Sequence, residues 1–233
     1  NLKKDEYFFK KIKFQLERVN FISEKINIKR KKDNFLIDGI VKNNQSSLNK
    51  NIFKLLNINF KNINLENVKF STDNKFDLEI NSKLKIKNFN LNSDINLNHV
   101  KYKKPKIIQN YFSEINELIL FNNHILNLNY NNDNLSIKGK GEIQLGNNID
   151  QIKYLINKKN KDLNIDAELL VKNIYFKKQD FLKIFFPKIN KTINLNNQIL
   201  NIKYNNKNLS FSESGRFKIN KDFEEINYFV EKK

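Results

Sequence analysis

A tandem repeat constrains the fold of this chain more than any other feature of its sequence. Residues 86–159 and 160–233 align without a gap along their full lengths, and 24 of the 74 aligned pairs are identical. The match is clearest between 125–145 and 199–219. Units duplicated in this way complete their apolar layer by stacking on one another.

A weaker third copy precedes these two. Residues 25–39 resemble 125–139, with five identical positions, and further alternating segments occupy 51–85. The sequence therefore predicts three units: a divergent one at 1–85 with extra strands, one at 86–159 and one at 160–233. No linker rich in proline or glycine separates them, so we expect one continuous sheet.

Within each unit, apolar and polar residues alternate with a period of two. Leu126, Leu128 and Tyr130 are one example, and Leu200, Ile202 and Tyr204 repeat it. This alternation is typical of strands with one apolar face and one solvated face. Polar clusters at Asn131–Asn134, Asn205–Asn208 and Asp73–Lys75 predict turns, and the basic run Lys29–Lys32 lies where another hairpin turn is expected.

One segment per copy has helical spacing instead. Apolar residues follow an i, i+1, i+4, i+5, i+8 pattern over 107–115, and a similar pattern recurs over 181–189. A comparable helix is expected near Glu6–Val19. The predicted fold class is mainly β: a long antiparallel, strongly twisted and curved sheet of tandem repeats, forming an open β-groove with a short helix per repeat.

Composition limits the functional classes. The net charge is +18, yet the 43 basic residues include only three arginines, Arg18, Arg30 and Arg216. Nucleic-acid recognition favours arginine for its bidentate geometry, and the lysines here alternate along strands as a solvated face would. We therefore expect no nucleic-acid partner. No cysteine is present, and no run of about 18 apolar residues could span a bilayer.

The residues of common active sites are sparse. His99 and His124 show no metal-ligand spacing, and both are expected at the surface near strand ends. Gly139 and Gly141 precede a strand pattern rather than a helix, which favours a bend or bulge over a phosphate site. We expect no enzyme activity, no catalytic residues, no cofactor and no metal.

The segments LSIKGKGEIQL (135–145), IDQIKYLI (149–156) and LNIDAEL (163–169) resemble those of the AsmA-like envelope proteins, relatives of YhdP and TamB. The resemblance covers 86–233 well and 1–85 loosely. It implies a protein anchored in the inner membrane of a Gram-negative cell by a segment not present here. Its periplasmic part would be a repeating β-groove that shields or conducts phospholipids for envelope and outer-membrane biogenesis.

On this resemblance, the acyl chains of phospholipids are the expected partners, with the two membranes reached through other regions. The apolar positions that match the repeated unit are the lipid-groove candidates: Leu126, Leu128, Tyr130, Leu135, Ile137, Leu200, Ile202, Tyr204, Leu209 and Phe211.

Two other interpretations remain open. The same alternation is compatible with a structural or adhesive β-repeat array of the cell surface, in which helices or a second sheet seal the apolar face. An enzyme or nucleic-acid-binding protein on a β scaffold would need a convergent polar pocket or a salt-sensitive basic surface.

Overall fold

The computed structural model describes residues 5–47, 63–64, 68–104, 112, 114–177, 192–219 and 222–232. They form one antiparallel sheet of thirteen strands and contain no helix. Neighbours in the sheet are neighbours in sequence, except that the two-residue β4 pairs with β6. The strands are β1 (Glu6–Leu16), β2 (Val19–Lys31), β3 (Asn34–Ser47), β4 (Ile63–Asn64), β5 (Lys69–Asn81), β6 (Ile86–Lys103), β7 (Leu118–Asn131), β8 (Asn134–Gln144), β9 (Asp150–Lys159), β10 (Asp162–Lys177), β11 (Thr192–Asn205), β12 (Leu209–Ile219) and β13 (Asp222–Lys232).

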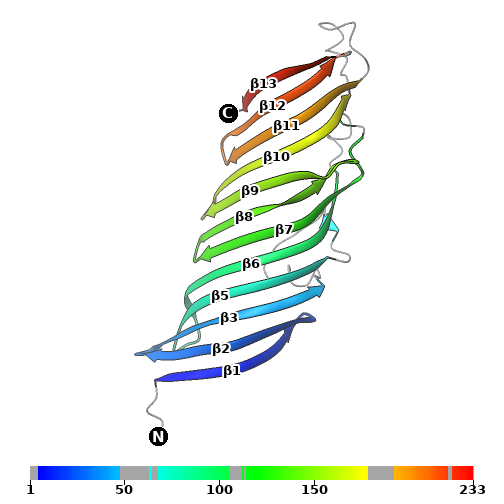
Figure 1. Cartoon of the computed structure of the whole chain (residues 1–233). Helices are drawn as coiled ribbons and strands as arrows, with labels where there is room; N and C mark the ends of the chain where they lie inside the picture. The colour runs from blue at the N-terminus through cyan, green and yellow to red at the C-terminus, as the bar shows by residue number, and fades with distance from the viewer. Residues whose placement is uncertain are drawn as a thin grey trace.

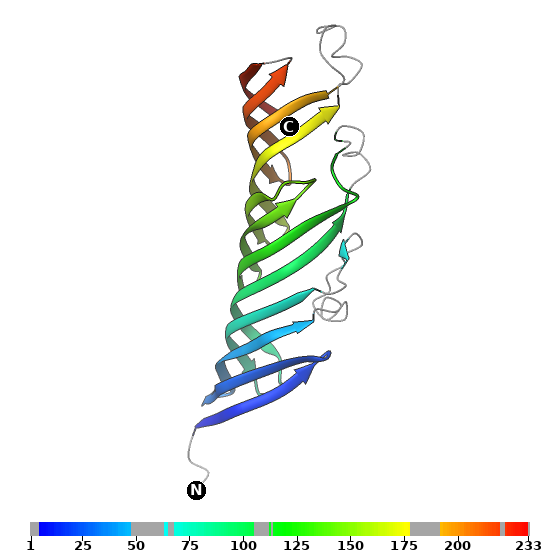
Figure 2. The ribbon, with the colours of Figure 1, turned by 45° about the vertical axis from the view of Figure 1, so that its right-hand side comes forward.

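The sheet is a long, twisted strip. Figure 1 shows the strands stacked like the rungs of a ladder, with β1 at one end and β13 at the other. Turned by 45°, the same strands curve along their length (Figure 2). The prediction of a single antiparallel, twisted and curved β sheet is confirmed.

The two long edges of the strip differ in their connections. At one edge, which we call the tight-turn edge, short turns join β2 to β3, β7 to β8 and β9 to β10. Lys32, Asn132 and Asn160 have φ values of 54°, 48° and 54° there, as tight hairpin turns require. The predicted turns at Lys29–Lys32, Asn131–Asn134 and Asn205–Asn208 all lie at this edge. The opposite edge carries the longer connections, such as 104–117 and 178–191, and we call it the long-connection edge.

Two β-bulges interrupt the ladder at positions that the alignment of the two copies makes equivalent. The register of β7 with β8 shifts between Asn122 and Ile125, and that of β11 with β12 shifts between Asn196 and Ile199. Asn123 and Asn197 both have a φ of 51°. Asparagine tolerates this left-handed conformation better than most residues, so each bulge forms at small cost.

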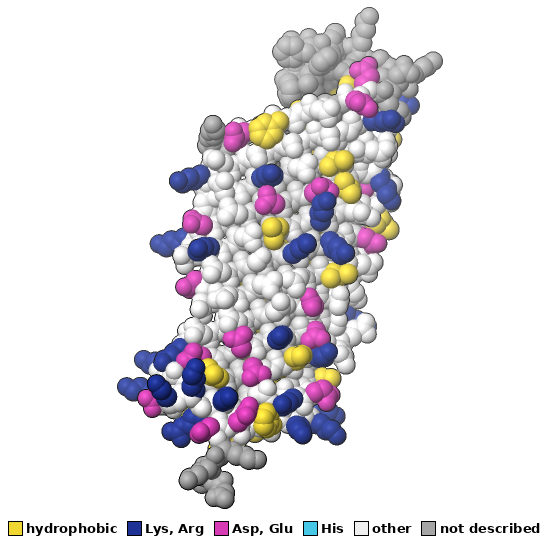
Figure 3. Space-filling model, turned by 60° about the vertical axis from the view of Figure 1, so that its left-hand side comes forward, with side chains coloured by type: hydrophobic (Ala, Val, Ile, Leu, Met, Phe, Trp, Pro, Cys, Tyr) yellow, Lys and Arg dark blue, Asp and Glu magenta, His cyan; other side chains and the backbone are white. Residues whose placement is uncertain are grey.

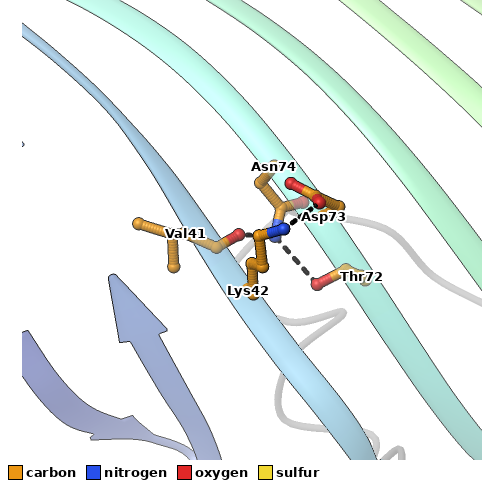
Figure 4. A network of polar contacts seen from close by, with 5 residues as sticks. All are labelled: Val41, Lys42, Thr72, Asp73 and Asn74. Atoms are coloured by element: carbon orange, nitrogen blue, oxygen red, sulfur yellow. Dashed lines mark hydrogen bonds and ion pairs between the residues drawn. The ribbon is translucent and has the colours of Figure 1, made fainter. Parts of the chain in front are cut away.

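The turn predicted at Asp73–Lys75 is wrong, because these residues lie inside β5. The polar side chains of Asp73 and Asn74 find partners on the neighbouring strand β3 (Figure 4). The Asn74 side-chain amide donates to the Val41 carbonyl at 2.9 Å and to Thr72 Oγ1 at 2.8 Å, and Lys42 forms a 2.7 Å ion pair with Asp73. A polar run can therefore continue a strand when partners across the ladder take up its hydrogen bonds.

The helix expected near Glu6–Val19 is also wrong. These residues form β1 and the start of β2, joined by Glu17 and Arg18 with φ values of 47° and 68°. The helical segment at 181–189 lies outside the described residues, as does most of 107–115. Of the latter, Phe112 has no regular structure and Ile115 lies in a bend, so the described part contains no helix per repeat.

Strand bounds follow the alignment of the two copies closely. β7 begins at 118 and ends at 131, and the aligned positions, 192 and 205, are where β11 begins and ends. The four strands β6–β9 occupy 86–159, and β10–β13 occupy the following segment. The division into units at 1–85, 86–159 and 160–233 stays a prediction from sequence.

Candidate functional site

The ten predicted groove residues lie on one face of the sheet, which we call the apolar face. Several of them lie directly opposite one another on neighbouring strands: Leu128 pairs with Ile137, and Ile202 pairs with Phe211. Paired residues in an antiparallel ladder project to the same face, so one row of side chains crosses many strands. One such row contains Leu128, Ile137, Ile156, Ile165, Tyr204 and Leu209, and the next contains Leu126, Gly139, Tyr154, Ala167, Ile202, Phe211 and Val230.

The apolar face continues into the first strands, where sequence reasoning named no groove residue. A third row crosses β1 to β8 and contains Phe9, Ile26, Gly39, Phe76, Leu91, Tyr130 and Leu135. Strand alternation alone could have found these residues, because they obey the same period. The apolar face therefore spans both the divergent N-terminal strands and the repeated ones.

Toward the tight-turn edge this face is only partly covered. Tyr204 and Leu209 are 38% and 44% exposed, and the other eight predicted residues are half-buried. The described residues form a single layer, so nothing among them packs over this region. An open layer of apolar side chains offers a surface on which another apolar molecule can lose its contact with water.

Toward the long-connection edge the same face is closed. Ile115, Ile119, Ile143, Leu145 and Val171 form a buried cluster, in which Val171 is 2% exposed. The segment before β7 folds against the segment after β8, because the amide of Asn116 donates to the Leu145 carbonyl at 2.8 Å. We call this group the sealed cluster.

Two aromatic rings fill the space above the glycines of β8. The His124 ring lies over Gly141, where a Cβ would meet His124 Cδ2 at 2.3 Å, and the Tyr154 ring lies over Gly139 in the same way. The ring centroids of His124 and Tyr154 are 6.1 Å apart. The surface position predicted for His124 is therefore wrong: its side chain is 4% exposed, because the ring lies over Gly141 and beside the Tyr154 ring.

Burial sets the protonation of this histidine. Desolvation lowers the pKa of His124, opposed by its hydrogen bond to the Glu142 carbonyl at 3.0 Å. The ring is therefore neutral near pH 7 and behaves as a packing group. The other histidine, His99, is only half-buried, and its ring Nδ1 lies 2.7 Å from Asn122 Oδ1.

The equivalent positions of the last copy carry different chemistry. Gln198 lies over Gly215 as His124 lies over Gly141, but Glu213 replaces Gly139. Glu213 is 7% exposed and bonds to the Tyr228 hydroxyl, which pairs with it across the ladder. Burial raises the pKa of Glu213, and the Tyr228 hydrogen bond opposes that rise. The apolar face thus contains one buried carboxyl group near its C-terminal end.

Asp150 is a second buried carboxyl group, at the start of β9. It is 2% exposed and accepts a hydrogen bond from the Lys172 amide at 2.9 Å. Burial raises its pKa, and the Lys172 amide opposes the rise. The bond ties β9 to the bordering strand β10 beside the sealed cluster, which is a structural role.

The opposite face of the sheet, the polar face, is covered by asparagines and charges. Asn92 donates to Asn129 at 2.8 Å, and Asn127 donates to Asp94 at 2.8 Å. Figure 3 shows a face on which charged side chains of both signs are scattered among other polar ones, with few hydrophobic side chains between them. Such a surface favours solvation over apolar contact.

One depression of about 660 Å³ crosses β7 to β11. Its rims are polar-face rows that include Lys138, Lys140 and Lys153, and Lys153 forms a 2.7 Å ion pair with Glu168. Ile202 alone of the ten predicted residues borders it. Its shape is open and its charged side chains have both signs, whereas the binding sites of small molecules and cofactors are enclosed and have a few convergent polar groups.

The described residues contain no group of three or more potential metal ligands, and none of their segments is a helix able to cross a membrane. Comparison with known proteins found no matching family model, relative or solved structure.

Proposed function

We propose that the apolar face is a groove that holds the acyl chains of phospholipids, and that this chain is a segment of a periplasmic protein that shields or conducts lipids between the two membranes of a Gram-negative envelope. The anchor in the inner membrane and the contacts with both membranes would lie in other regions of the protein. The head groups would remain in water at the tight-turn edge.

One observation carries this proposal: rows of apolar side chains cross the strands without a second layer above them on the described part of the chain. Each methylene removed from water contributes about 0.8 kcal/mol, so covering such a row with an acyl chain is favourable. The surface is linear, as a chain-shaped ligand requires.

The dimensions suit several lipids along one strip. Half the hydrocarbon core of a bilayer is about 15 Å thick, so one acyl chain covers roughly three strands spaced about 4.8 Å apart. Leu128 on β7 and Ile202 on β11 are four strand spacings apart. They would therefore contact different acyl chains, and each is a separate test of the groove.

The sealed cluster supports a second candidate, a structural or adhesive β-repeat array. There the same face is already buried without any ligand, by Ile143, Leu145 and their neighbours. If residues outside the described part also covered Tyr204 and Leu209, no lipid surface would remain. The two candidates differ only in whether the tight-turn edge of the apolar face is open in solution.

Native mass spectrometry with lipid extraction decides between them. The protein is expressed in a Gram-negative host and purified without detergent, alongside the variant Leu128→Asp/Ile202→Asp. The matched control is Asn129→Asp/Asn201→Asp, which adds the same charge one residue away on the polar face. We expect phospholipid on the unchanged protein and on the control, and loss of it from the apolar-face variant.

A folded protein without lipid would support the repeat array instead. Far-ultraviolet circular dichroism of all three proteins keeps the result interpretable, because a variant that unfolds also loses lipid. Equal lipid content in the two variants would show that the co-purified lipid lies elsewhere.

A further inference from the structure

Basic side chains gather at the tight-turn edge, which is the left-hand edge in Figure 1. The turn between β5 and β6 also lies there, because Asn81 pairs with Asn34. The turns of this edge, with the residues that flank them, are 29–33, 81–87, 131–134, 158–162 and 205–208. They contain eleven lysines and arginines against three acidic residues, so about a tenth of the chain carries +8 of its net charge of +18.

Two of these basic residues project from the apolar face itself. Arg30 pairs with Phe35, and Lys158 pairs with Leu135 and Leu163. Paired residues of an antiparallel ladder share a face, so both cations lie in rows of apolar side chains. Each is one residue from the end of its strand, and each side chain is exposed. They therefore lie where the apolar face meets the water beyond the turns.

Neither cation has an acidic partner within the described part of the chain. The ion pairs there join other lysines to carboxylates, as Lys153 is joined to Glu168. Arg30 Nε donates a long hydrogen bond of 3.4 Å to the Lys32 carbonyl, at an exposed position. The charges of Arg30 and Lys158 are thus free to attract an anion from outside the sheet.

Exposed apolar side chains accompany the basic ones at this edge. Leu84 and Ile86 are 75% and 66% exposed, and they alternate with lysines in the turn between β5 and β6. Ile86 pairs with Ile80, which pairs with Phe35 beside Arg30. A surface that combines exposed apolar side chains with unpaired cations suits an amphiphile that has an apolar chain and an anionic head group.

We propose that the tight-turn edge binds phosphate head groups and selects phospholipids with a net negative charge. This inference rests on the proposed lipid groove and specifies the class of lipid that the groove holds. Lysine attracts a phosphodiester, and the arginine guanidinium binds two of its oxygens at once. A zwitterionic head group also brings an ammonium group, which the surrounding basic residues repel, whereas an anionic head group brings none.

Arg30 and Lys158 contact the head groups of different lipids. Arg30 lies on β2 and Lys158 on β9, and six strand spacings separate these strands. At about 4.8 Å per spacing, the separation is about 29 Å. One acyl chain covers roughly three strands, so each cation lies beside its own lipid.

Lipid transfer from vesicles of defined composition tests this selection. The purified protein is mixed with vesicles of phosphatidylglycerol, which is anionic, and phosphatidylethanolamine, which is zwitterionic. The two are present in equal amounts with identical deuterated acyl chains, which distinguishes them from lipids of the expression host. After the vesicles are removed by ultracentrifugation, mass spectrometry of the extract counts each lipid on the protein.

The unchanged protein should hold about five times more phosphatidylglycerol than phosphatidylethanolamine, the effect of about one cation per head group. At about 1 M salt the Debye length falls to about 3 Å, so the preference should disappear while the lipid remains bound. This measurement needs no variant.

The variant Arg30→Gln/Lys158→Gln removes both cations from the apolar face. We expect it to hold as much lipid in total, with the ratio of phosphatidylglycerol to phosphatidylethanolamine reduced about fivefold. The matched control is Arg216→Gln/Lys140→Gln, which removes one arginine and one lysine that are exposed on the polar face. It should keep the ratio of the unchanged protein. Circular dichroism confirms that each variant is folded.

Equal amounts of the two lipids on the unchanged protein would overturn this inference without affecting the lipid groove. No transferred lipid of either kind would overturn the groove itself, and the inference with it. A preference that high salt does not change would contradict selection by charge. So would an equal loss of preference in the control variant, because the effect would then come from net charge and not from the tight-turn edge.

Discussion

The apolar face contains two regions built from the same alternation but packed differently. At the long-connection edge, Val171 and Ile143 are 2% and 5% exposed within the sealed cluster. At the tight-turn edge, Tyr204 and Leu209 are 38% and 44% exposed. Both regions belong to the same face of one sheet, so the difference in exposure comes from what packs against each region. Period-two alternation therefore fixes which side chains share a face and leaves open whether that face is sealed.

The largest expected effect comes from placing a charge in each region. Val171→Asp buries an unpaired carboxylate and should lower the free energy of unfolding by about 3–5 kcal/mol. Leu209→Asp at the exposed edge should cost at most about 1 kcal/mol. Urea denaturation followed by circular dichroism measures both. Equal losses would mean that the tight-turn edge is also sealed.

A smaller effect is expected at the glycines beneath the buried rings. Gly141→Ala forces the His124 ring to move, since the new Cβ would lie 2.3–2.7 Å from it, and should cost about 1–3 kcal/mol. At Gly39 the nearest atoms are 3.1–3.2 Å away, so Gly39→Ala should cost less. The double variant Gly141→Ala/His124→Ala should lose less than the sum of its parts in thermal or urea unfolding. Strict additivity would contradict the close contact.

A pH-dependent effect is expected where the two regions meet. The raised pKa of Glu213 means that the folded protein binds its proton more tightly than the unfolded chain does. This carboxyl group therefore makes stability fall as pH rises from about the ordinary value of 4.5 through the folded pKa. Glu213→Gln should raise the free energy of unfolding near pH 7 and flatten its pH dependence. An unchanged pH profile would show that Glu213 is solvated.

The smallest effect is expected on the polar face. The ion pair of Lys153 with Glu168 is 2.7 Å long, but the Lys153 side chain is 65% exposed. Exposed pairs contribute about 0–1 kcal/mol, so Lys153→Ala should change stability by no more than that and should leave lipid content unchanged. Lys140→Ala, a nearby exposed lysine, is the control. Loss of lipid with Lys153→Ala would indicate that lipid binds the polar face, which contradicts a groove on the apolar face.

Much of the sheet follows from local sequence rules. Alternation and asparagine-rich turns located the hairpins at Asn131–Asn134 and Asn205–Asn208 and grouped the ten apolar residues on one face. These features depend on neighbours in sequence or directly across one ladder, which is the range over which such patterns are informative.

Features that depend on distant partners were missed. The run Asp73–Lys75 looked like a turn because its partners, Val41 and Lys42, are far away in sequence. His124 looked like a surface residue because its burial depends on Gly141 on the next strand and on the Tyr154 ring, both distant in sequence. The sealed cluster combines residues from several strands and connections, so alternation alone could not separate it from the open region.

Site-specific photocrosslinking tests the central claim most directly. Benzoylphenylalanine is placed at Leu128 and Ile202 on the apolar face, and at Asn129 and Asn201 on the polar face, and the protein is irradiated in Gram-negative cells. The account predicts lipid adducts, seen by intact-protein mass, at Leu128 and Ile202 and none at their neighbours. Adducts at all four positions, or at the polar-face positions alone, would contradict a lipid groove on the apolar face.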